Sequence, residues 1–308
     1  MVEDDVLHVK SDMRTQEKLA RRAKEASLHT STLPGLPKVG VAAEFSNFQI
    51  FDSTNIDCHS NIASQVCLEQ AVLSHANGSM GPLSQDSGRD GLPVWRNLAL
   101  WADVEEPIMP CGSCRDALIR SGKTDSEIIS RTAGGRTLEI PISWLLPLAG
   151  LGEEGDVSEE IDYFRALGGY VSSFIPDDLE VLLDEAKKAS ESSWIPHFAK
   201  DKIAASGAAL RMTDDTVVLG WRTQESTKQL TDSAIVTALR KALQEPFNKE
   251  LKVKAAAFFS DSKVLRAPSG SDLQALLELS DGNIPLVFAC GDGRKFHSSL
   301  RELLPKPF

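Results

Sequence analysis

The chain has 308 residues, of which 42% are hydrophobic, and a formal net charge of -11. This length allows one large domain or two ordinary ones, each able to bury its own core. The acidic balance argues against DNA or RNA polymers as partners, because these are held largely through their phosphates. No apolar run is long enough to cross a membrane, and the N-terminus lacks the apolar centre of a signal peptide, so we expect a soluble, cytoplasmic protein.

The first half of the chain alternates helical and strand patterns, which predicts an α/β fold. A continuous apolar strand over 97–103 is typical of a parallel or mixed sheet. The expected elements, in chain order, are a helix over 14–27, strands over 39–45 and 48–54, a helix over 66–76, an irregular insertion over 77–96, the strand over 97–103, and a helix from 111 that ends at a C-cap, Gly122.

The same order of elements recurs in the second half. The acidic, glycine-containing segment 151–160 is the best domain boundary. We therefore expect a first domain over 1–150, a linker over 151–177 and a second domain over 178–308. The expected elements of the second half are a helix over 177–192, strands over 204–212 and 216–221, a helix over 232–243, a strand over 254–259 and a helix over 269–278.

Four pairs of identical residues support an internal duplication, because all are separated by 158 positions. The pairs are Pro110 and Pro268, Gly135 and Gly293, Arg136 and Arg294, and Pro147 and Pro305. We predict two tandem α/β/α domains, each with a mixed central sheet flanked by helices.

Three cysteines lie at the predicted starts of helices. Cys111 and Cys114 form a C-x-x-C pair, and Cys67 opens the helix that also carries Glu69. Helix N-termini favour thiolates, and three protein ligands leave open the fourth position of a catalytic zinc ion. Taken singly, the C-x-x-C pair also fits a redox pair, and Cys67 a buried core thiol. The combination C-x-E with a later P-C-x-x-C is more specific and has the form of the zinc deaminase signature.

At these residues the chain resembles the cytidine deaminases, which act on free nucleosides in pyrimidine salvage. The segment 97–118 resembles that family's strand, metal loop and helix, and "TNID" at 54–57 resembles its sugar-binding Asn-x-Glu. The resemblance is strong over 38–150 and weak over 178–308. It also extends to the larger dimeric members, in which a second domain has lost its zinc.

The resemblance implies one zinc ion per chain, bound by Cys67, Cys111 and Cys114. It further implies hydrolysis of the 4-amino group of cytosine, with Glu69 moving protons between the attacking water, N3 and the leaving ammonia. Arg115, next to Cys114, is expected to offset the negative charge of the thiolates.

In the same way, the resemblance implies that Asn55 and Asp57 contact the sugar hydroxyls. Asp57 is one methylene shorter than the usual Glu, and Pro37 replaces an aromatic residue that stacks on the base. These departures favour an alternative, a deaminase of a modified cytosine nucleoside, a nucleoside antibiotic or another aminated heterocycle. A non-catalytic, zinc-stabilised dimeric scaffold is the alternative of another class, and the presence of Glu69 argues against it.

The second half lacks the thiols. Ser269 and Asp272 stand where Cys111 and Cys114 stood, and an ungapped alignment places Leu230 opposite Cys67 and Asp232 opposite Glu69. We therefore predict a metal-free second domain that helps to assemble a homodimer.

The chain ends on an aromatic residue, Phe308. We propose that Phe308 crosses the dimer interface and covers the substrate of the partner. The alternative is that it packs on its own domain.

Overall fold

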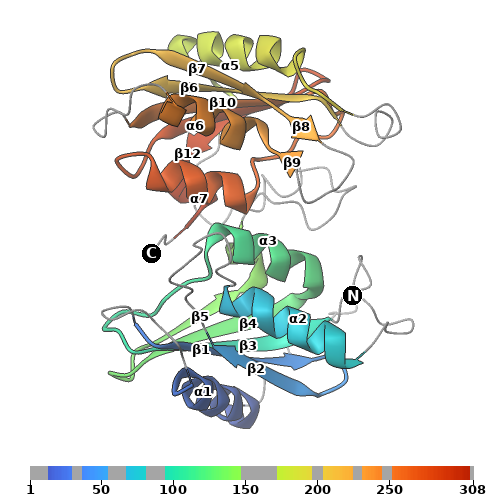
Figure 1. Cartoon of the computed structure of the whole chain (residues 1–308), viewed down its shortest axis with the longest axis vertical. Helices are drawn as coiled ribbons and strands as arrows, with labels where there is room; N and C mark the ends of the chain where they lie inside the picture. Colours follow the sequence, from blue (N-terminus) through green and yellow to red (C-terminus); the bar gives the residue numbers. More distant parts are fainter. Residues whose placement is uncertain are drawn as a thin grey trace, which may run out of the picture. The chain divides into compact units, whose positions relative to one another are not determined.

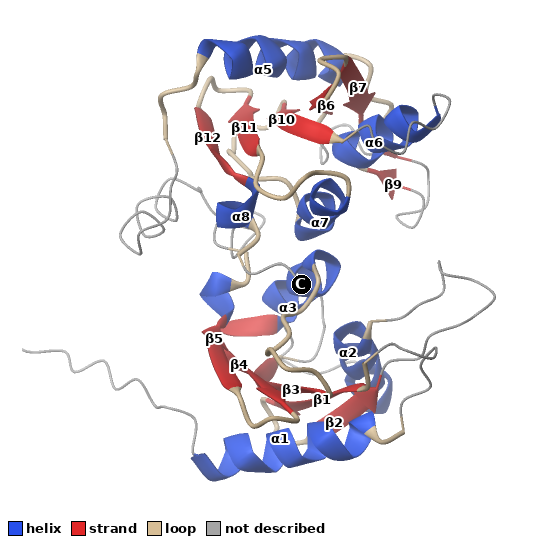
Figure 2. Ribbon diagram, turned by 90° about the vertical axis from the view of Figure 1, so that its left-hand side faces the viewer, coloured by secondary structure: helices blue, strands red, loops and turns tan. Residues whose placement is uncertain are grey.

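The computed structural model describes residues 13–29, 37–54, 67–80, 94–146, 172–195, 204–224, 231–244 and 252–305. These residues form two five-stranded mixed sheets flanked by helices, so the predicted α/β fold class is confirmed (Figures 1 and 2). Two compact units result, one of residues 1–110 and 117–143 and the other of residues 111–116 and 144–308. Below, each unit is named by its sheet, and the whole of the segment 111–121 is counted with the first. None of the described helices is both long enough and apolar enough to cross a bilayer.

The first sheet has the strand order β2-β1-β3-β4-β5. Strands β3 and β4 are parallel, and the other neighbours are antiparallel. Helix α1 covers one face, and α2 and α3 lie on the other (Figures 1 and 2). The elements are α1 Met13–Ser27, β1 Val39–Phe45, β2 Ile50–Thr54, α2 Leu68–Met80, β3 Trp95–Ala102, α3 Gly112–Ser121, β4 Gly122–Thr132, β5 Thr137–Pro141 and the 3-10 helix Ile142–Trp144.

The second sheet has the strand order β12-β11-β10-β6-β7, with β10 and β11 parallel. Helix α5 covers one face, and α6 and α7 lie on the other (Figure 1). Strands β8 and β9 pair separately. The elements are α5 Asp177–Ser190, β6 Ser206–Met212, β7 Val217–Trp221, β8 Thr223–Gln224, β9 Thr231–Asp232, α6 Ala234–Gln244, β10 Val253–Ser260, α7 Gly270–Glu278, β11 Pro285–Cys290, β12 Lys295–Ser299 and α8 Leu300–Leu303.

The two sheets repeat each other in register. Leu98 pairs with Ile128 between β3 and β4, and Ala256 pairs with Leu286 between β10 and β11, 158 positions later in both strands. The turns that follow β4 and β11 also match, since each places a glycine at positive φ. These are Gly135 (φ 81°) and Gly293 (φ 91°). The structure therefore confirms that the fold is duplicated.

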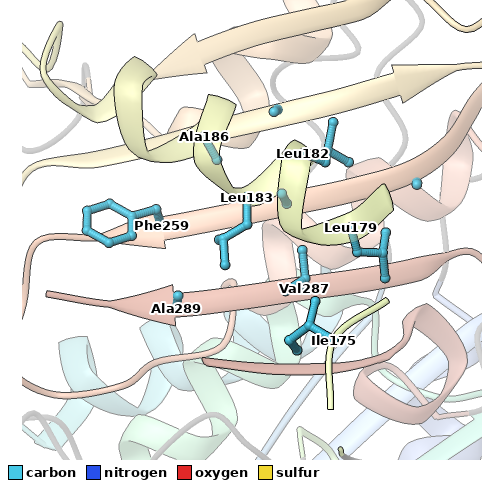
Figure 3. Close-up of a cluster of buried hydrophobic side chains, with 11 residues drawn as sticks. Ile175, Leu179, Leu182, Leu183, Ala186, Phe259, Val287 and Ala289 are labelled. Carbon is cyan, nitrogen blue, oxygen red and sulfur yellow. The ribbon is translucent and has the colours of Figure 1, made fainter. Parts of the chain in front are cut away.

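Helix α5 builds the core of the second unit with one apolar face (Figure 3). Leu179, Leu182, Leu183 and Ala186 are spaced by three and four residues, so they share one side of the helix. They pack on side chains of β6, β10 and β11, which are alanines except for Phe259 and Val287. In the first unit, the cluster of Leu19, Ala23, Ala42 and Ala99 repeats this arrangement between α1, β1 and β3.

A glycine in the first sheet strand of each unit lets the covering helix approach closely. A Cβ atom at Gly40 would lie 2.0 Å from the carbonyl oxygen of Ala23, and one at Gly207 would lie 2.0 Å from that of Ala186. Backbone oxygens of a packed helix cannot move away easily. Both positions therefore require glycine for space rather than for an unusual φ.

Two local predictions are wrong. Residues 77–80, expected to be irregular, continue α2 as far as Met80, and residues 81–93 lie outside the described chain. Helix α3 does end directly before Gly122, at Ser121, but Gly122 is not the predicted C-cap, because it begins β4 without a positive φ. Position 122 requires glycine for a steric reason, because a Cβ atom there would lie 2.4 Å from Cδ1 of Ile142 and 2.9 Å from the Trp95 ring.

Most of the expected linker, 151–171, lies outside the described residues. At its end, Ser172 forms a β-bridge with His297, and Ile175 joins the core beneath α5. The proposed domain boundaries at 150 and 178 stay predictions.

Candidate metal centre

Helices α2 and α3 each begin directly after a cysteine. The carbonyl of Cys67 accepts a hydrogen bond from the Ala71 amide at 3.0 Å, and that of Cys111 accepts one from the Arg115 amide at 2.9 Å. Both cysteines are therefore N-cap residues, beside the partial positive charge of a helix start. Cys114, in the first turn of α3, is fully buried. Helix starts in general favour the thiolate form of cysteine, which is the form that binds metals.

The three sulfurs lie close together. All lie within 4.8 Å of one another, and Sγ of Cys111 is 3.4 Å from Sγ of Cys114. Zn–S bonds of about 2.3 Å in a tetrahedral site place two sulfurs about 3.8 Å apart, a value between these two distances. Within the described chain, this is the one group of three or more Cys, His, Asp or Glu side chains near enough to hold a metal ion. The donor set suits a thiophilic ion.

Glu69 lies in the first turn of α2, two residues after Cys67, and only 5% of it is exposed. A carboxylate at this end of a helix is favoured by the helix dipole. Burial there keeps the group away from bulk water, which suits a side chain that exchanges protons with a bound molecule. The roles of Glu69 and the three cysteines stay predictions.

Helix α3 is fixed by buried side chains near both ends. Trp95 donates from Nε1 to the carbonyl of Leu118 at 2.9 Å, and Arg115 donates from Nη1 to the carbonyl of Leu145 at 3.1 Å. Both side chains are almost completely buried. The positive charge of Arg115 is therefore held inside the protein, one residue from Cys114.

Three predicted functional residues lie outside the described chain. Asn55 and Asp57 follow β2, which ends at Thr54, and Phe308 is the last residue. Their assignments stay predictions.

The second unit shows which residues replace the cysteines, and it corrects one alignment. Ser233 stands directly before α6, and its carbonyl accepts from the Thr237 amide at 3.0 Å, as that of Cys67 accepts from Ala71. Its Oγ also accepts from the Val236 amide at 3.1 Å. Ser233, rather than Leu230, is therefore the counterpart of Cys67.

The alignment of Asp232 with Glu69 is also wrong. Asp232 belongs to β9, and the counterpart of Glu69 in α6 is Ile235. An ungapped alignment assumed that α6 starts three residues earlier than it does. A sequence signal could have found Ser233, because a serine directly before an apolar helical run is a favoured N-cap.

In the second unit, three polar side chains pair with one another where the first unit has thiols. Ser233 donates to one carboxylate oxygen of Asp272, and Ser269 donates to the other at 2.8 Å. The Asp272 amide in turn donates to Oγ of Ser269 at 3.2 Å. Burial raises the pKa of Asp272, and the hydrogen bonds from both serines oppose that rise. We call Ser233, Ser269 and Asp272 the polar triad.

No family model matches the chain, but individual known proteins are similar to it in sequence. The chain is 30% identical to the cytidine deaminase of Sporosarcina psychrophila over 131 residues. This match covers 42% of this chain and 91% of that protein. The cytidine deaminase of Halalkalibacterium halodurans matches at 30% identity over 131 residues, 42% of this chain and 94% of that protein. The crystal structure of cytidine deaminase from Burkholderia pseudomallei is 24% identical and covers 42% of this chain and 95% of its own, with a TM-score of 0.37.

The two sequence relatives are matched over nearly their whole lengths at 30% identity. The match takes up 42% of this chain, which leaves room for a second unit. The resemblance predicted from the cysteine and glutamate motif is thereby confirmed, and the chain belongs to the cytidine deaminase family.

Proposed function

We propose that this protein is a zinc-dependent hydrolase that converts a free cytosine nucleoside, cytidine or deoxycytidine, to the corresponding uridine and ammonia. The observation that carries the proposal is the gathering of three cysteine sulfurs within 4.8 Å of one another. Two relatives that are named cytidine deaminase support it. The buried carboxylate of Glu69, two residues after the first of these cysteines, favours a catalytic over a structural centre.

Each chemical role falls to a residue of this chain. Zinc, when bound, supplies a Lewis acid that makes water a usable nucleophile near neutral pH. Cys67, Cys111 and Cys114 would hold the ion through their three thiolates. The Glu69 carboxylate takes a proton from the water that attacks C4 and gives it to N3. It then takes the second proton of that oxygen and gives it to the 4-amino group, so that the C4–N bond breaks and ammonia leaves.

We assign the sugar contacts to Asn55 and Asp57, which follow the end of β2 in the sequence. Asp57 and Pro37 favour a second candidate, a cytosine nucleoside with a modified base or sugar. The shorter side chain of Asp57 leaves more room at the sugar, and Pro37 lacks the ring that stacks on an ordinary base.

The experiment is an ammonia-release screen with the full-length, zinc-loaded protein. The substrates are cytidine, deoxycytidine, cytosine, adenosine and cytosine nucleosides with bulkier bases or sugars. The proposal expects turnover of cytidine or deoxycytidine, and the second candidate expects faster turnover of a bulkier nucleoside. Absence of ammonia from every compound would contradict both and favour a zinc-stabilised scaffold.

We further propose that the protein is a homodimer whose second domain carries no metal. Light scattering coupled to size-exclusion chromatography measures the molecular mass directly. A mass equal to that of one 33.5 kDa chain at micromolar concentration would refute the dimer.

A further inference from the structure

The start of helix α3 packs together with the start of helix α7. Residues 111–116, counted above with the first sheet, form one compact unit with residues 144–308. This short segment carries Cys111 and Cys114, two of the three cysteines of the candidate metal centre. Helix α7 begins 158 positions after α3, so it is the repeated copy of that helix. The contacts of this segment therefore bear on where the two sulfurs lie.

Gly112 and Gly270, the first residues of the two helices, lie directly against each other. A Cβ atom at Gly112 would lie 1.8 Å from the carbonyl oxygen of Gly270, and one at Gly270 would lie 2.3 Å from the carbonyl oxygen of Gly112. Neither position can carry a side chain unless a backbone moves. The contact is therefore close, and it is reciprocal between equivalent residues of the two copies.

Hydrogen bonds between the two helices follow the same reciprocal pattern. The Asp116 carboxylate accepts from the amides of Gly270 and Ser271, both at 3.0 Å, and from Oγ of Ser271 at 3.2 Å. In return, Oε1 of Gln274, which lies 158 positions after Asp116, accepts from the Gly112 amide at 3.4 Å. Amides at a helix start have no acceptor within their own helix. Each helix thus supplies an acceptor for the start of the other.

The buried side chain of Arg115 holds the same segment at two further points. Its Nη1 donates to the carbonyl of Leu145 at 3.1 Å and to the carbonyl of Pro305 at 2.8 Å. Leu145 and Pro305 belong to the two copies of the Leu-Leu-Pro sequence. Hydrogen bonds from a charged donor are stronger than those between neutral groups. The start of α3 is therefore fixed by its side chains as well as by its contact with α7.

We propose that Asp116 and Gln274 are positioning residues for the metal centre, because they hold the start of α3 where its cysteines can bind the ion. The inference rests on the proposed zinc centre. The hydrogen bonds join this helix start to α7 at Gly112 and at Asp116, and Cys114 lies between these two points. A metal site needs ligand distances close to the ideal values, so a turn that is already held loses less freedom when the ion binds.

The test is the zinc affinity of the full-length protein, measured by competition with a chromophoric chelator. Asp116→Ala removes the acceptor of three hydrogen bonds and should weaken zinc binding by about 10–100-fold, as is typical when a group that supports metal ligands is lost. Asp116→Asn keeps one acceptor oxygen, so its loss of affinity should be smaller. Asp184→Ala, at an exposed aspartate of α5, is the matched control and should bind zinc as the wild type does.

Two variants test the same contact from the side of α7. In Gly270→Ala, the Cβ atom would overlap the carbonyl oxygen of Gly112, so the start of α3 must shift. The visible absorption of bound Co²⁺ should then show a changed ligand geometry. Gln274→Ala removes a single, longer hydrogen bond and should lower the zinc affinity less than Asp116→Ala does.

Urea denaturation of the metal-free proteins separates positioning from stability. If Asp116→Ala and Gly270→Ala unfold earlier but bind zinc as tightly as the wild type does, the contact only stabilises the fold, and the proposal is overturned. If either variant does not fold, Asp116→Asn and Gln274→Ala decide the question. Weaker zinc binding in the folded variants supports the proposal whether or not the ammonia screen finds a substrate. A wild-type protein that binds no zinc would overturn both this inference and the proposed zinc centre.

Discussion

At the scale of single residues, buried polar side chains occupy equivalent places in the two units but serve different purposes. In the first unit, Glu69 is buried in the first turn of α2, next to an N-cap thiol. In the second unit, Ile235 occupies the position that corresponds to Glu69. The buried carboxyl group of that unit belongs to Asp272 instead. The Asp272 carboxylate accepts hydrogen bonds from two serines of its own chain.

Glu69→Gln tests the proposed catalytic role. The amide has nearly the same shape but neither takes up nor releases a proton near neutral pH, so the variant should fold and keep its metal. Activity on the best substrate of the screen should fall by about 10²–10⁴-fold. Glu25→Gln, at an exposed glutamate of α1, is the control and should retain full activity. Near-normal turnover by a metal-loaded Glu69→Gln protein would show that another group moves the proton.

Asp272→Ala tests the polar triad. The substitution removes the acceptor of both serine hydroxyls and leaves polar groups without a partner, which should cost about 1–3 kcal/mol of unfolding free energy. Asp272→Asn keeps one acceptor oxygen and avoids burying a charge, so its loss should be smaller. Urea denaturation measures both values. Equal midpoints for Asp272→Ala and the wild type would show that the triad adds nothing to stability.

At the scale of elements, a helix sits tightly on a glycine-containing strand in each unit. Gly40 lies in β1 beneath α1, and Gly207 lies in β6 beneath α5. In both, the atom nearest to an added Cβ is a backbone oxygen rather than part of a flexible side chain. The closeness of helix and sheet therefore depends on these two residues.

Gly40→Ala and Gly207→Ala should each destabilise the protein by about 1–3 kcal/mol or more, because a Cβ would overlap the helix backbone. Gly134→Ala is the control, since a Cβ there would meet only Oγ1 of Thr132 at 3.7 Å. Chemical denaturation should show earlier unfolding of the two packed variants and little change in the control. Similar midpoints for all three variants would contradict the steric account.

The sequence pattern predicts most elements because apolar runs form the buried strands and apolar residues at helical spacing form the buried helix faces. The strand predicted over 39–45 has the bounds that the structure shows, since its apolar run is bounded by polar residues. The failures arise from tertiary contacts. The end of α3 before Gly122 is predicted correctly, but the need for glycine there comes from the nearby side chains of Ile142 and Trp95 rather than from a C-cap. The metal-ligand pattern of the first unit is visible as a motif, whereas the polar triad is not, because serine and aspartate are common at N-cap positions of every kind.

At the scale of the whole molecule, the duplication gives one chain two versions of the same fold with different chemistry. The sheets share strand order and register, yet three cysteine sulfurs gather in the first version and the polar triad stands in the second. The shared backbone geometry implies that only side chains separate the version whose cysteines could hold a metal ion from the version that carries the polar triad.

The triple substitution Ser233→Cys, Ser269→Cys and Asp272→Cys tests this inference. The wild type should contain about one zinc ion per chain, and the triple variant should contain about two, because a third thiol in place of Asp272 completes the ligand set. Metal analysis by mass spectrometry measures the ratio. The single variant Ser271→Cys is the control and should stay at about one. A triple variant that folds but remains at one ion would show that the backbone of the second version has drifted from metal-site geometry.

The polar triad has a consequence for how the protein responds to metal scarcity. A site built from three thiols depends on an ion for its cohesion, because neighbouring thiolates repel one another without it. The triad supplies its own hydrogen bonds within the chain. Under chelation, amide hydrogen exchange should accelerate at the starts of α2 and α3 and stay slow at those of α6 and α7. In a zinc-poor cell, the second unit of a newly made chain would then fold without metal, before the first unit binds its zinc ion.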